Sequence, residues 1–218
     1  KLISWQASFV YITAIIFSAF QIITAAFNPV SSQVLRSLHV GFLLLLVFLL
    51  FDVKGQPRKG PIPIYDWALS LISFALAFYH WFFEADLIQR AGDPNTVDLF
   101  VGCAVVILVV DAARRIMGWG LPLFCIAFIP YALFGRWLPG FLQHRGFGFD
   151  QVIDQMFLGT EGIYGVATFV SATFIFLFIL FGAFLERAGM IQLFNDVAMG
   201  TVGHHKDGPA KVAVVSST

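Results

Sequence analysis

The sequence predicts an all-α protein that crosses a membrane several times. Its mean hydropathy is +0.84 and 12% of its residues are charged, against roughly 25% in soluble domains. The stretch 166–185 contains no charged residue, and a helix of about 20 residues is long enough to cross the ~30 Å hydrocarbon core of a bilayer. Other apolar stretches of similar length alternate with polar, charged segments, as expected for membrane helices joined by loops in water.

Taken in order, the hydropathy and the loop signals predict six transmembrane helices, at 5–27, 35–51, 67–83, 97–115, 116–134 and 166–185. The first carries polar residues such as Gln21, which should face protein because hydrocarbon offers them no hydrogen-bond partner. The segment 52–64 is rich in proline, glycine and basic residues, which indicates a loop. Pro122 and Pro130 fall inside the fifth span, where a kink is expected.

Two shorter segments are amphipathic rather than uniformly apolar. In 149–158 the apolar residues fall on one face of a helix and the polar residues on the other, and 190–200 has the same pattern. A short helix with this arrangement is typical of segments that lie in the plane of the membrane interface. Both are therefore predicted to be interfacial helices that do not cross.

The basic residues predict the orientation, because cytoplasmic loops carry an excess of lysine and arginine. The side that holds the amino end has nine of the 13 basic residues and the other side four. The larger set comprises Lys1, Lys54, Arg58, Lys59, Arg114, Arg115, Arg187, Lys206 and Lys211, and the smaller comprises Arg36, Arg90, Arg136 and Arg145. The amino end is therefore predicted to be cytoplasmic.

Composition and motifs exclude several function classes. The formal net charge is zero, so the chain has no basic surplus with which to bind nucleic acid. Cys103 and Cys125 fall inside apolar spans, where cysteine behaves as a small hydrophobe and implies neither a disulfide nor a metal site. His204 and His205 lack further ligands at metal-binding spacing. No catalytic motif or phosphate-binding loop is present, so neither catalysis nor a cofactor is expected.

Polar residues within the spans allow two interpretations. Gln21 and His39 favour hydrogen bonding between helices, and the alternative for His39 is a proton relay. Asp111 lies three residues before Arg114 and four before Arg115, the spacing for ion pairs along one helix face. That cluster favours a structural role at the cytoplasmic boundary, and the alternative is binding of an anionic lipid headgroup.

Three hydroxyl side chains in the last span, Thr168, Ser171 and Thr173, are candidates for a transport path. Thr168 and Ser171 share a helix face, whereas Thr173 lies off it. The alternative is that these hydroxyls only bond backbone carbonyls one turn earlier in their own helix.

Several sequence stretches together resemble a known family. They are VSATFIFLFILFGAFLERAG, the amphipathic segment after it and GPAKVAVVSS, supported by Phe20-Gln21, Arg36-Ser37-Leu38-His39, DAARR at 111–115 and YALFG at 131–135. In this order they resemble the membrane component of tripartite ATP-independent periplasmic (TRAP) transporters, in the fused form whose binding proteins are of the TAXI type.

The resemblance implies an elevator-type architecture in three parts. Residues 1–115 would be a four-helix scaffold like the small subunit, 116–165 a fusion helix with a periplasmic loop, and 166–218 the beginning of the large-subunit-like transport portion. The sequence opens on Lys1 and ends as another apolar segment begins, so we expect the natural protein to extend in both directions.

The function that the resemblance implies is import of a small organic anion across a bacterial inner membrane. An ion gradient of Na⁺ or H⁺ would drive it, and a TAXI-type periplasmic binding protein would deliver the anion. The polar segments 84–96 and 136–148 are candidate docking loops, through Glu84, Asp86, Arg90, Asp93, Arg136, His144 and Arg145. A membrane scaffold without a transport role is the alternative, and an intramembrane enzyme is disfavoured because no catalytic dyad lies at membrane depth.

Overall fold

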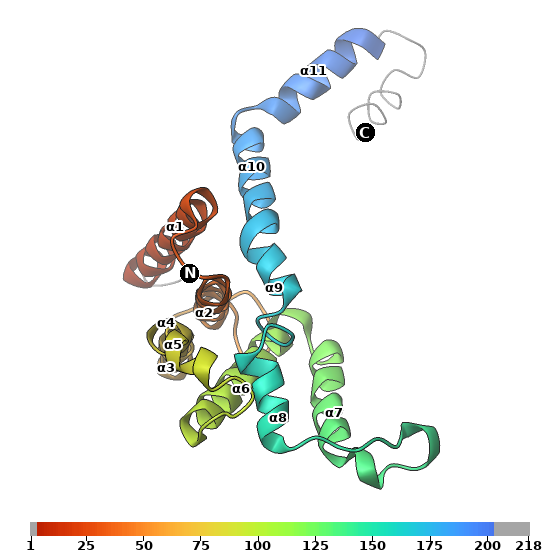
Figure 1. Cartoon of the computed structure of the whole chain (residues 1–218). Coiled ribbons are helices and arrows are strands. Elements are labelled where there is room, and N and C mark those ends of the chain that lie inside the picture. Colours follow the sequence, from red (N-terminus) through yellow and green to blue (C-terminus); the bar gives the residue numbers. More distant parts are fainter. Residues whose placement is uncertain (1–3, 203–218) are drawn as a thin grey trace. The chain divides into compact units, whose positions relative to one another are not determined.

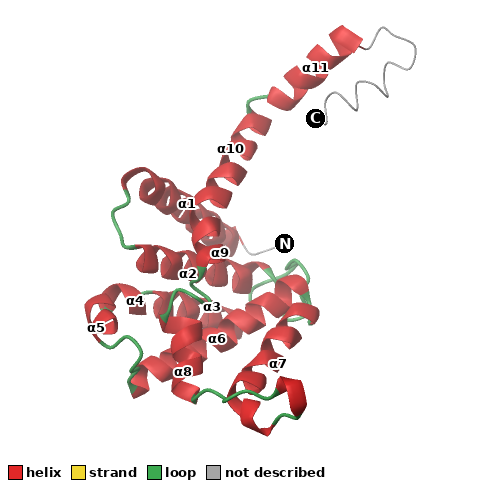
Figure 2. Ribbon diagram, turned by 45° about the vertical axis from the view of Figure 1, so that its right-hand side comes forward, coloured by secondary structure: helices red, strands yellow, loops and turns green. Residues whose placement is uncertain are grey.

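The computed structural model describes residues 4–202, and every regular element in that range is helical (Figures 1 and 2). The chain divides into two compact units, Lys1–Thr173 and Phe174–Thr218, which are described separately. The second unit contains α10 (Phe176–Arg187) and α11 (Met190–Val202), which contact each other across a turn at Gly189, where φ is +77°.

The first unit contains most of the helices. They are α1 (Ser4–Phe27), α2 (Ser32–Leu50), α3 (Ile64–Ala77), α4 (Tyr79–Phe82), α5 (Glu84–Gln89), α6 (Thr96–Met117), α7 (Gly120–Phe134), α8 (Phe149–Ile153) and α9 (Val166–Val170). Two 3₁₀ turns, η1 (Gly135–Trp137) and η2 (Gly140–Leu142), follow α7. Two π-helical segments, η3 (Asp154–Leu158) and η4 (Ser171–Ile175), continue α8 and α9.

Five helices of the described range are long and apolar enough to cross a membrane, which confirms the all-α polytopic class. The predicted third span, 67–83, is wrong as a single helix because α3 ends at Ala77. The Ala77 carbonyl accepts a hydrogen bond from Ser37 Oγ at 2.7 Å, and the Trp81 N–H bonds the Phe78 carbonyl at 3.0 Å instead. The Ser37 side chain of α2 thus bonds the Ala77 carbonyl, and the α-helical hydrogen bonds of α3 end at this residue.

The boundary between the fourth and fifth spans also differs from the prediction. The fourth continues to Met117, and Gly118 ends it with φ +74°, a conformation that favours glycine. The fifth therefore begins at Gly120, so Pro122 lies in its first turn, where proline costs no hydrogen bond, and Pro130 lies inside the helix.

Helix α2 is the most buried of the five long helices and contacts α1, α3, α6 and α9. Phe48 and Leu49 are completely buried on it. Gly41 has no Cβ, which lets the Ala77 side chain of α3 pack directly against the α2 backbone. Small residues allow this close approach in membrane helices, where packing replaces the hydrophobic drive between them.

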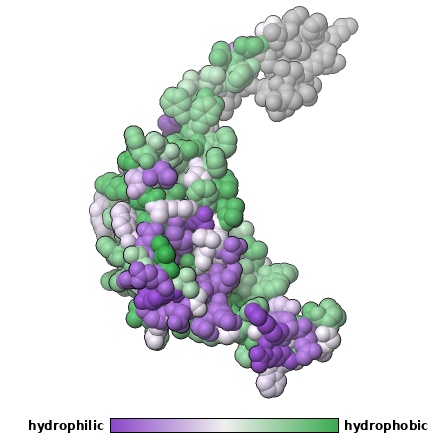
Figure 3. All heavy atoms as spheres, in the orientation of Figure 1, coloured by the Kyte–Doolittle hydropathy of each residue, from purple (hydrophilic) through white to green (hydrophobic). Residues whose placement is uncertain are grey.

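Helix α1 buries mainly polar side chains and exposes apolar ones, which is the reverse of an amphipathic helix in a soluble protein. Its buried side chains are mostly polar and include Gln6, Thr13, Gln21 and Thr24, which confirms for these four that polar residues of this span face protein. Ser8 is exposed and bonds the Ser4 carbonyl of its own helix instead. Most of its large apolar residues are exposed, with Phe17 buried as the exception, as hydrocarbon surroundings would favour. Figure 3 shows hydrophobic residues over much of the visible face, with hydrophilic residues gathered over the lower part of the first unit.

The segment 149–158 is helical as predicted, but its apolar side faces protein. Val152, Ile153 and Phe157 are buried, and α8 and η3 both contact α6. Packing on α6 therefore accounts for the amphipathic pattern, and the placement of this segment in the membrane interface stays a prediction. The segment 190–200 lies within α11, and its interfacial placement stays a prediction.

The contact between α6 and η3 gives a prediction about stability. A Cβ built on Gly102 would lie 2.5 Å from Ile153 Cγ2 and 3.1 Å from Phe157 Cδ1. We expect Gly102→Leu to destabilise the protein by about 1–3 kcal/mol through overpacking, and to lower its apparent Tm in detergent.

Gly182→Leu is the matched control, because a Cβ on Gly182 would meet no atom within 4 Å. Equal Tm changes for the two substitutions would contradict the packing of η3 on α6.

Candidate functional site

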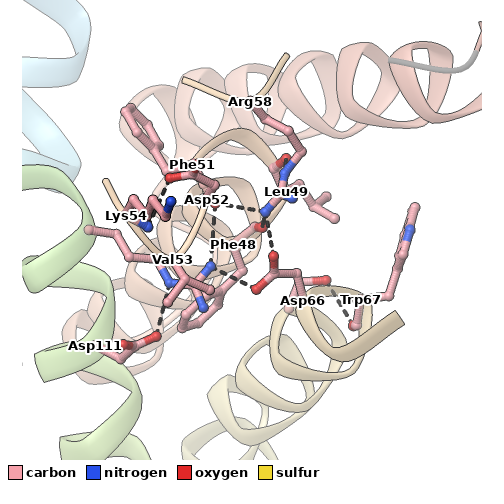
Figure 4. A network of polar contacts seen from close by, with 12 residues as sticks. Phe48, Leu49, Phe51, Asp52, Val53, Lys54, Arg58, Asp66, Trp67 and Asp111 are labelled. Atoms are coloured by element: carbon pink, nitrogen blue, oxygen red, sulfur yellow. Dashed lines mark hydrogen bonds and ion pairs between the residues drawn. The ribbon is translucent and has the colours of Figure 1, made fainter. Parts of the chain in front are cut away.

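A buried ion network joins three parts of the first unit (Figure 4). Asp66, in the first turn of α3, has a side chain that is 0% exposed. Arg115 of α6 donates from Nη1 to Asp66 Oδ1 at 2.7 Å, and Arg58 of the loop between α2 and α3 forms an ion pair with Asp66 Oδ2. Arg115 is 2% exposed and Arg58 7%, so these charges compensate one another in a site that excludes water.

The same guanidinium groups also bond the carbonyl end of α2. Arg58 donates to the carbonyls of Leu49 at 3.1 Å and Phe51 at 2.9 Å, and Arg115 donates to that of Phe51 at 3.3 Å. The last carbonyls of a helix lack intrahelical partners and carry partial negative charge. The two arginines therefore cap α2 while they neutralise Asp66.

Asp111 extends the network along α6. Its carboxylate accepts from Arg114 Nε at 3.0 Å and from Arg115 Nε at 2.9 Å, which confirms the pairing that the sequence spacing predicts. Arg114 Nη1 also donates to the Val53 carbonyl at 2.7 Å, and its guanidinium lies 5.3 Å from the centre of the Trp119 ring. Because all these guanidinium groups bond protein, the arrangement favours the structural role over lipid binding.

The sequence interpretation missed Asp66 and Arg58 as members of this network. The available signal was an acidic residue at the start of an apolar helix, shortly after a basic loop. A carboxylate in that position needs a cation if it is buried. Its second partner, Arg115, is 49 residues away, and no local pattern identifies it.

A second polar cluster joins α1, α2 and η4 through His39. Gln21 Nε2 contacts His39 Nδ1, and His39 Nε2 lies 3.2 Å from Ser171 Oγ. The Gln21 amide and the Ser171 hydroxyl can each donate or accept, so the two nitrogens of the His39 ring have partners on both sides. Gln21 and His39 are both buried, and the contacts support interhelical hydrogen bonding.

Other side chains on the same part of α2 contact the segment that precedes η4. Arg36 Nη1 donates to the Tyr164 carbonyl at 2.7 Å, and its guanidinium lies 4.9 Å from the Phe169 ring centre. Gln33 Nε2 donates to the Leu158 carbonyl at 3.3 Å. Gln33 was not identified from the sequence, and Arg36 was named there only among the basic residues and in the stretch Arg36-Ser37-Leu38-His39.

The three hydroxyls proposed for a transport path are not brought together as one group. Thr168 Oγ1 donates to the Ile163 carbonyl at 2.5 Å, and Thr173 Oγ1 to the Phe169 carbonyl at 2.8 Å. Ser171 alone of the three contacts the buried histidine. Thr168 and Thr173 thus bond nearby backbone, and the role of all three in transport stays a prediction.

The candidate docking residues differ in the contacts that their side chains already make within the protein. Arg90 pairs with Asp98, Arg136 Nε donates to the Arg145 carbonyl, and His144 Nε2 lies 2.9 Å from the Tyr131 carbonyl oxygen. Glu84 and Asp86 lie in the first turn of α5. The exposed charged groups of the set are Asp86, Asp93, Arg136 and Arg145.

Asp98 forms a polar centre at the opposite end of α6 from Arg115. Its side chain is fully buried and accepts from Tyr79 Oη, from Arg90 Nη2 at 3.2 Å and from the Asn95 N–H at 2.8 Å. The last contact completes a capping box with Asn95 that satisfies the first turn of α6. Both ends of α6 are therefore held by buried carboxylates, Asp98 and Asp66.

Comparison with known proteins gives one match. The family described as tripartite ATP-independent periplasmic transporter, DctM component, matches residues 104–218, more than half of the chain. The chain belongs to this family. No curated protein and no solved structure matches it.

Membership has direct consequences for the function class. The chain is part of the membrane component of a TRAP transporter, and this family is one of transporter components rather than enzymes. Such a component acts in general with a periplasmic binding protein. The buried polar clusters described above are therefore parts of a transporter's membrane domain.

The ion network gives a prediction about folding. Asp66→Asn removes the charge between Arg58 and Arg115 and leaves both cations buried. We expect a loss of about 3–5 kcal/mol, because removing one partner of a buried pair leaves uncompensated charge. The measurement is thermal unfolding of the purified protein in detergent. Asp93→Asn, at an exposed position, is the control. If Asp66→Asn lowered the stability as little as Asp93→Asn does, the proposed role of Asp66 would be refuted.

The contact between Gln21 and His39 predicts an energetic coupling. A double-mutant cycle with Gln21→Leu and His39→Leu should give an interaction energy of about 0.6–1.7 kcal/mol, the range measured for hydrogen bonds between membrane helices. Unfolding in a mixed-micelle titration provides the energies. Additive effects of the two substitutions would show that the side chains do not interact.

Proposed function

We propose that this chain forms part of a TRAP transporter that imports a small organic anion across the bacterial inner membrane, as an ion-driven symporter with a TAXI-type periplasmic binding protein. The observation that carries the proposal is the family match over 104–218. Five apolar helices of spanning length and the polar buried face of α1 support a polytopic membrane location. The proposed orientation has a cytoplasmic amino end, since the basic loops favour that side.

The contacts support a scaffold role for the helices of 1–115. Buried charges join α3, α6 and the end of α2, and sliding these helices past one another would expose unpaired ions to a low-dielectric interior. Such a network resists relative motion. In an elevator mechanism this part would stay fixed, 116–165 would connect it to the transport portion, and 166–218 would begin that portion.

Most polar clusters of the first unit have structural partners, which favours the alternative of a scaffold with no transport role of its own. One measurement distinguishes the transporter from the scaffold. A transporter requires that substrate cross the membrane through the complete protein, whereas a scaffold only supports assembly. The same measurement shows whether Na⁺ or H⁺ is the coupling ion.

Reconstitution tests the proposal. The full-length protein in proteoliposomes, with its binding protein loaded with a radiolabelled dicarboxylate or glutamate, should accumulate label when a Na⁺ gradient or a proton gradient is imposed singly. We expect uptake with one of the two gradients, and none without the binding protein. Absence of uptake under both gradients, for a binding protein shown to hold the label, would favour the scaffold.

Docking is tested by charge reversal at the exposed loop residues. The triple variant Asp86→Lys, Asp93→Lys, Arg145→Glu should slow association with the binding protein at low salt by about tenfold and weaken its salt dependence, because rim charges chiefly affect the encounter rate. Lys54→Glu, in the loop between α2 and α3, is the control. Unchanged association across a salt series would place the docking surface on other residues.

A further inference from the structure

A large groove lies between α7 and the returning segment 145–156. Its volume is about 840 Å³, within the range of ligand-binding sites. Helices α7 and α8 lie side by side (Figures 1 and 2), and the Phe147 N–H bonds the Ala132 carbonyl at 2.9 Å. This hydrogen bond ties the loop that returns from α7 to the helix beside the groove.

One wall of the groove is an apolar face of α7. It consists of Phe124, Cys125, Phe128, Ile129 and Ala132, whose spacing places them along one side of the helix. Phe124 is 68% exposed and Phe128 61%. Since α7 is long and apolar enough to span the membrane, this wall suits an acyl chain that runs along the helix.

The other wall mixes polar residues with the apolar Phe147, Val152 and Met156, and carries one charge of each sign. Gln151, Asp154 and Gln155 line it, together with Arg145 near the returning loop. Arg145 lies over the Phe147 ring at 5.0 Å and makes no ion pair within the described range.

Asp154 lacks a cationic partner there as well, and it accepts a hydrogen bond from the backbone of Gly92. Burial, together with the charge of Asp150, raises the pKa of Asp154. A cation next to Asp154 would stabilise its ionised form and remove that penalty.

We propose that the groove binds a phospholipid whose acyl chain lies on α7 and whose headgroup places its phosphate at Arg145 and a primary ammonium at Asp154. The paired charges fit a zwitterionic headgroup, since a guanidinium binds phosphate and a carboxylate accepts from an ammonium N–H. An apolar protein helix in the groove would leave both charges unpaired. Phosphatidylglycerol has the phosphate but no ammonium to pair with Asp154, and a choline headgroup has no N–H to donate.

A native cysteine provides the assay. Cys125 is exposed on the apolar wall, and Cys103, which does not line the groove, is replaced by alanine. The full-length protein is delipidated in detergent, and the rate of Cys125 modification by a maleimide is measured with added dioleoyl phosphatidylethanolamine, phosphatidylcholine or phosphatidylglycerol. We expect the ethanolamine lipid to slow modification by about tenfold and the other two by much less. Equal protection by all three would overturn the assignment of the headgroup.

Three substitutions separate the polar and apolar contacts. Arg145→Gln should weaken retention of the ethanolamine lipid in native mass spectrometry by about tenfold, and Asp154→Asn should abolish the preference for it over phosphatidylglycerol. Ala132→Trp should fill the groove and remove the bound lipid. Lys54→Gln, an exposed charge that does not line the groove, is the control.

Two results would refute the proposal. One is unchanged lipid retention in both Arg145→Gln and Ala132→Trp, each verified as monodisperse. The other is efficient cross-linking of Cys125 to a protein segment in native membranes, which would show that a helix occupies the groove.

Discussion

The burial of Asp66 is the constraint on which the arrangement of the first unit depends. A carboxylate that is 0% exposed must be compensated, and its two partners come from the loop after α2 and from the end of α6. Those same arginines bond the terminal carbonyls of α2. One buried charge therefore fixes the positions of α2, α3 and α6 together, and the packing of Phe48 and Leu49 occurs inside that frame. His39 and Arg36 then use the opposite end of α2 to hold the segment 164–171.

Much of the fold can be predicted from the sequence because the thickness of the bilayer sets the length of a membrane-spanning helix. A run of about 20 apolar residues gives a helix in hydrocarbon whatever its neighbours are, so α1, α2, α6, α7 and the span Val166–Arg187 are recognisable by composition. The pair formed by Asp111 with Arg114 is equally local, since helix geometry alone brings the two together.

The rest depends on tertiary contacts that no local pattern encodes. The break after Ala77 depends on a hydroxyl of α2 that is 40 residues away. The partner of Gln21 is 18 residues away and that of Asp66 on α6 is 49. The apolar arc of 149–158 looks the same whether it meets a membrane surface or α6. Hydrophobic periodicity reports that a face is buried, but not what buries it.

The spacing of the two partners of Asp66 has a consequence for biogenesis. Arg58 is eight residues from Asp66, whereas Arg115 is 49 residues away. Arg58 has therefore already been synthesised when Asp66 is added to the chain, whereas Arg115 follows only once α6 has been made. The nascent hairpin of α2 and α3 can enter the bilayer with its carboxylate already neutralised by Arg58. The arrival of α6 then adds the second guanidinium to a preformed pair, together with Asp111 to balance it. Along the chain, the partner that neutralises Asp66 thus comes before the arginine that adds a further positive charge.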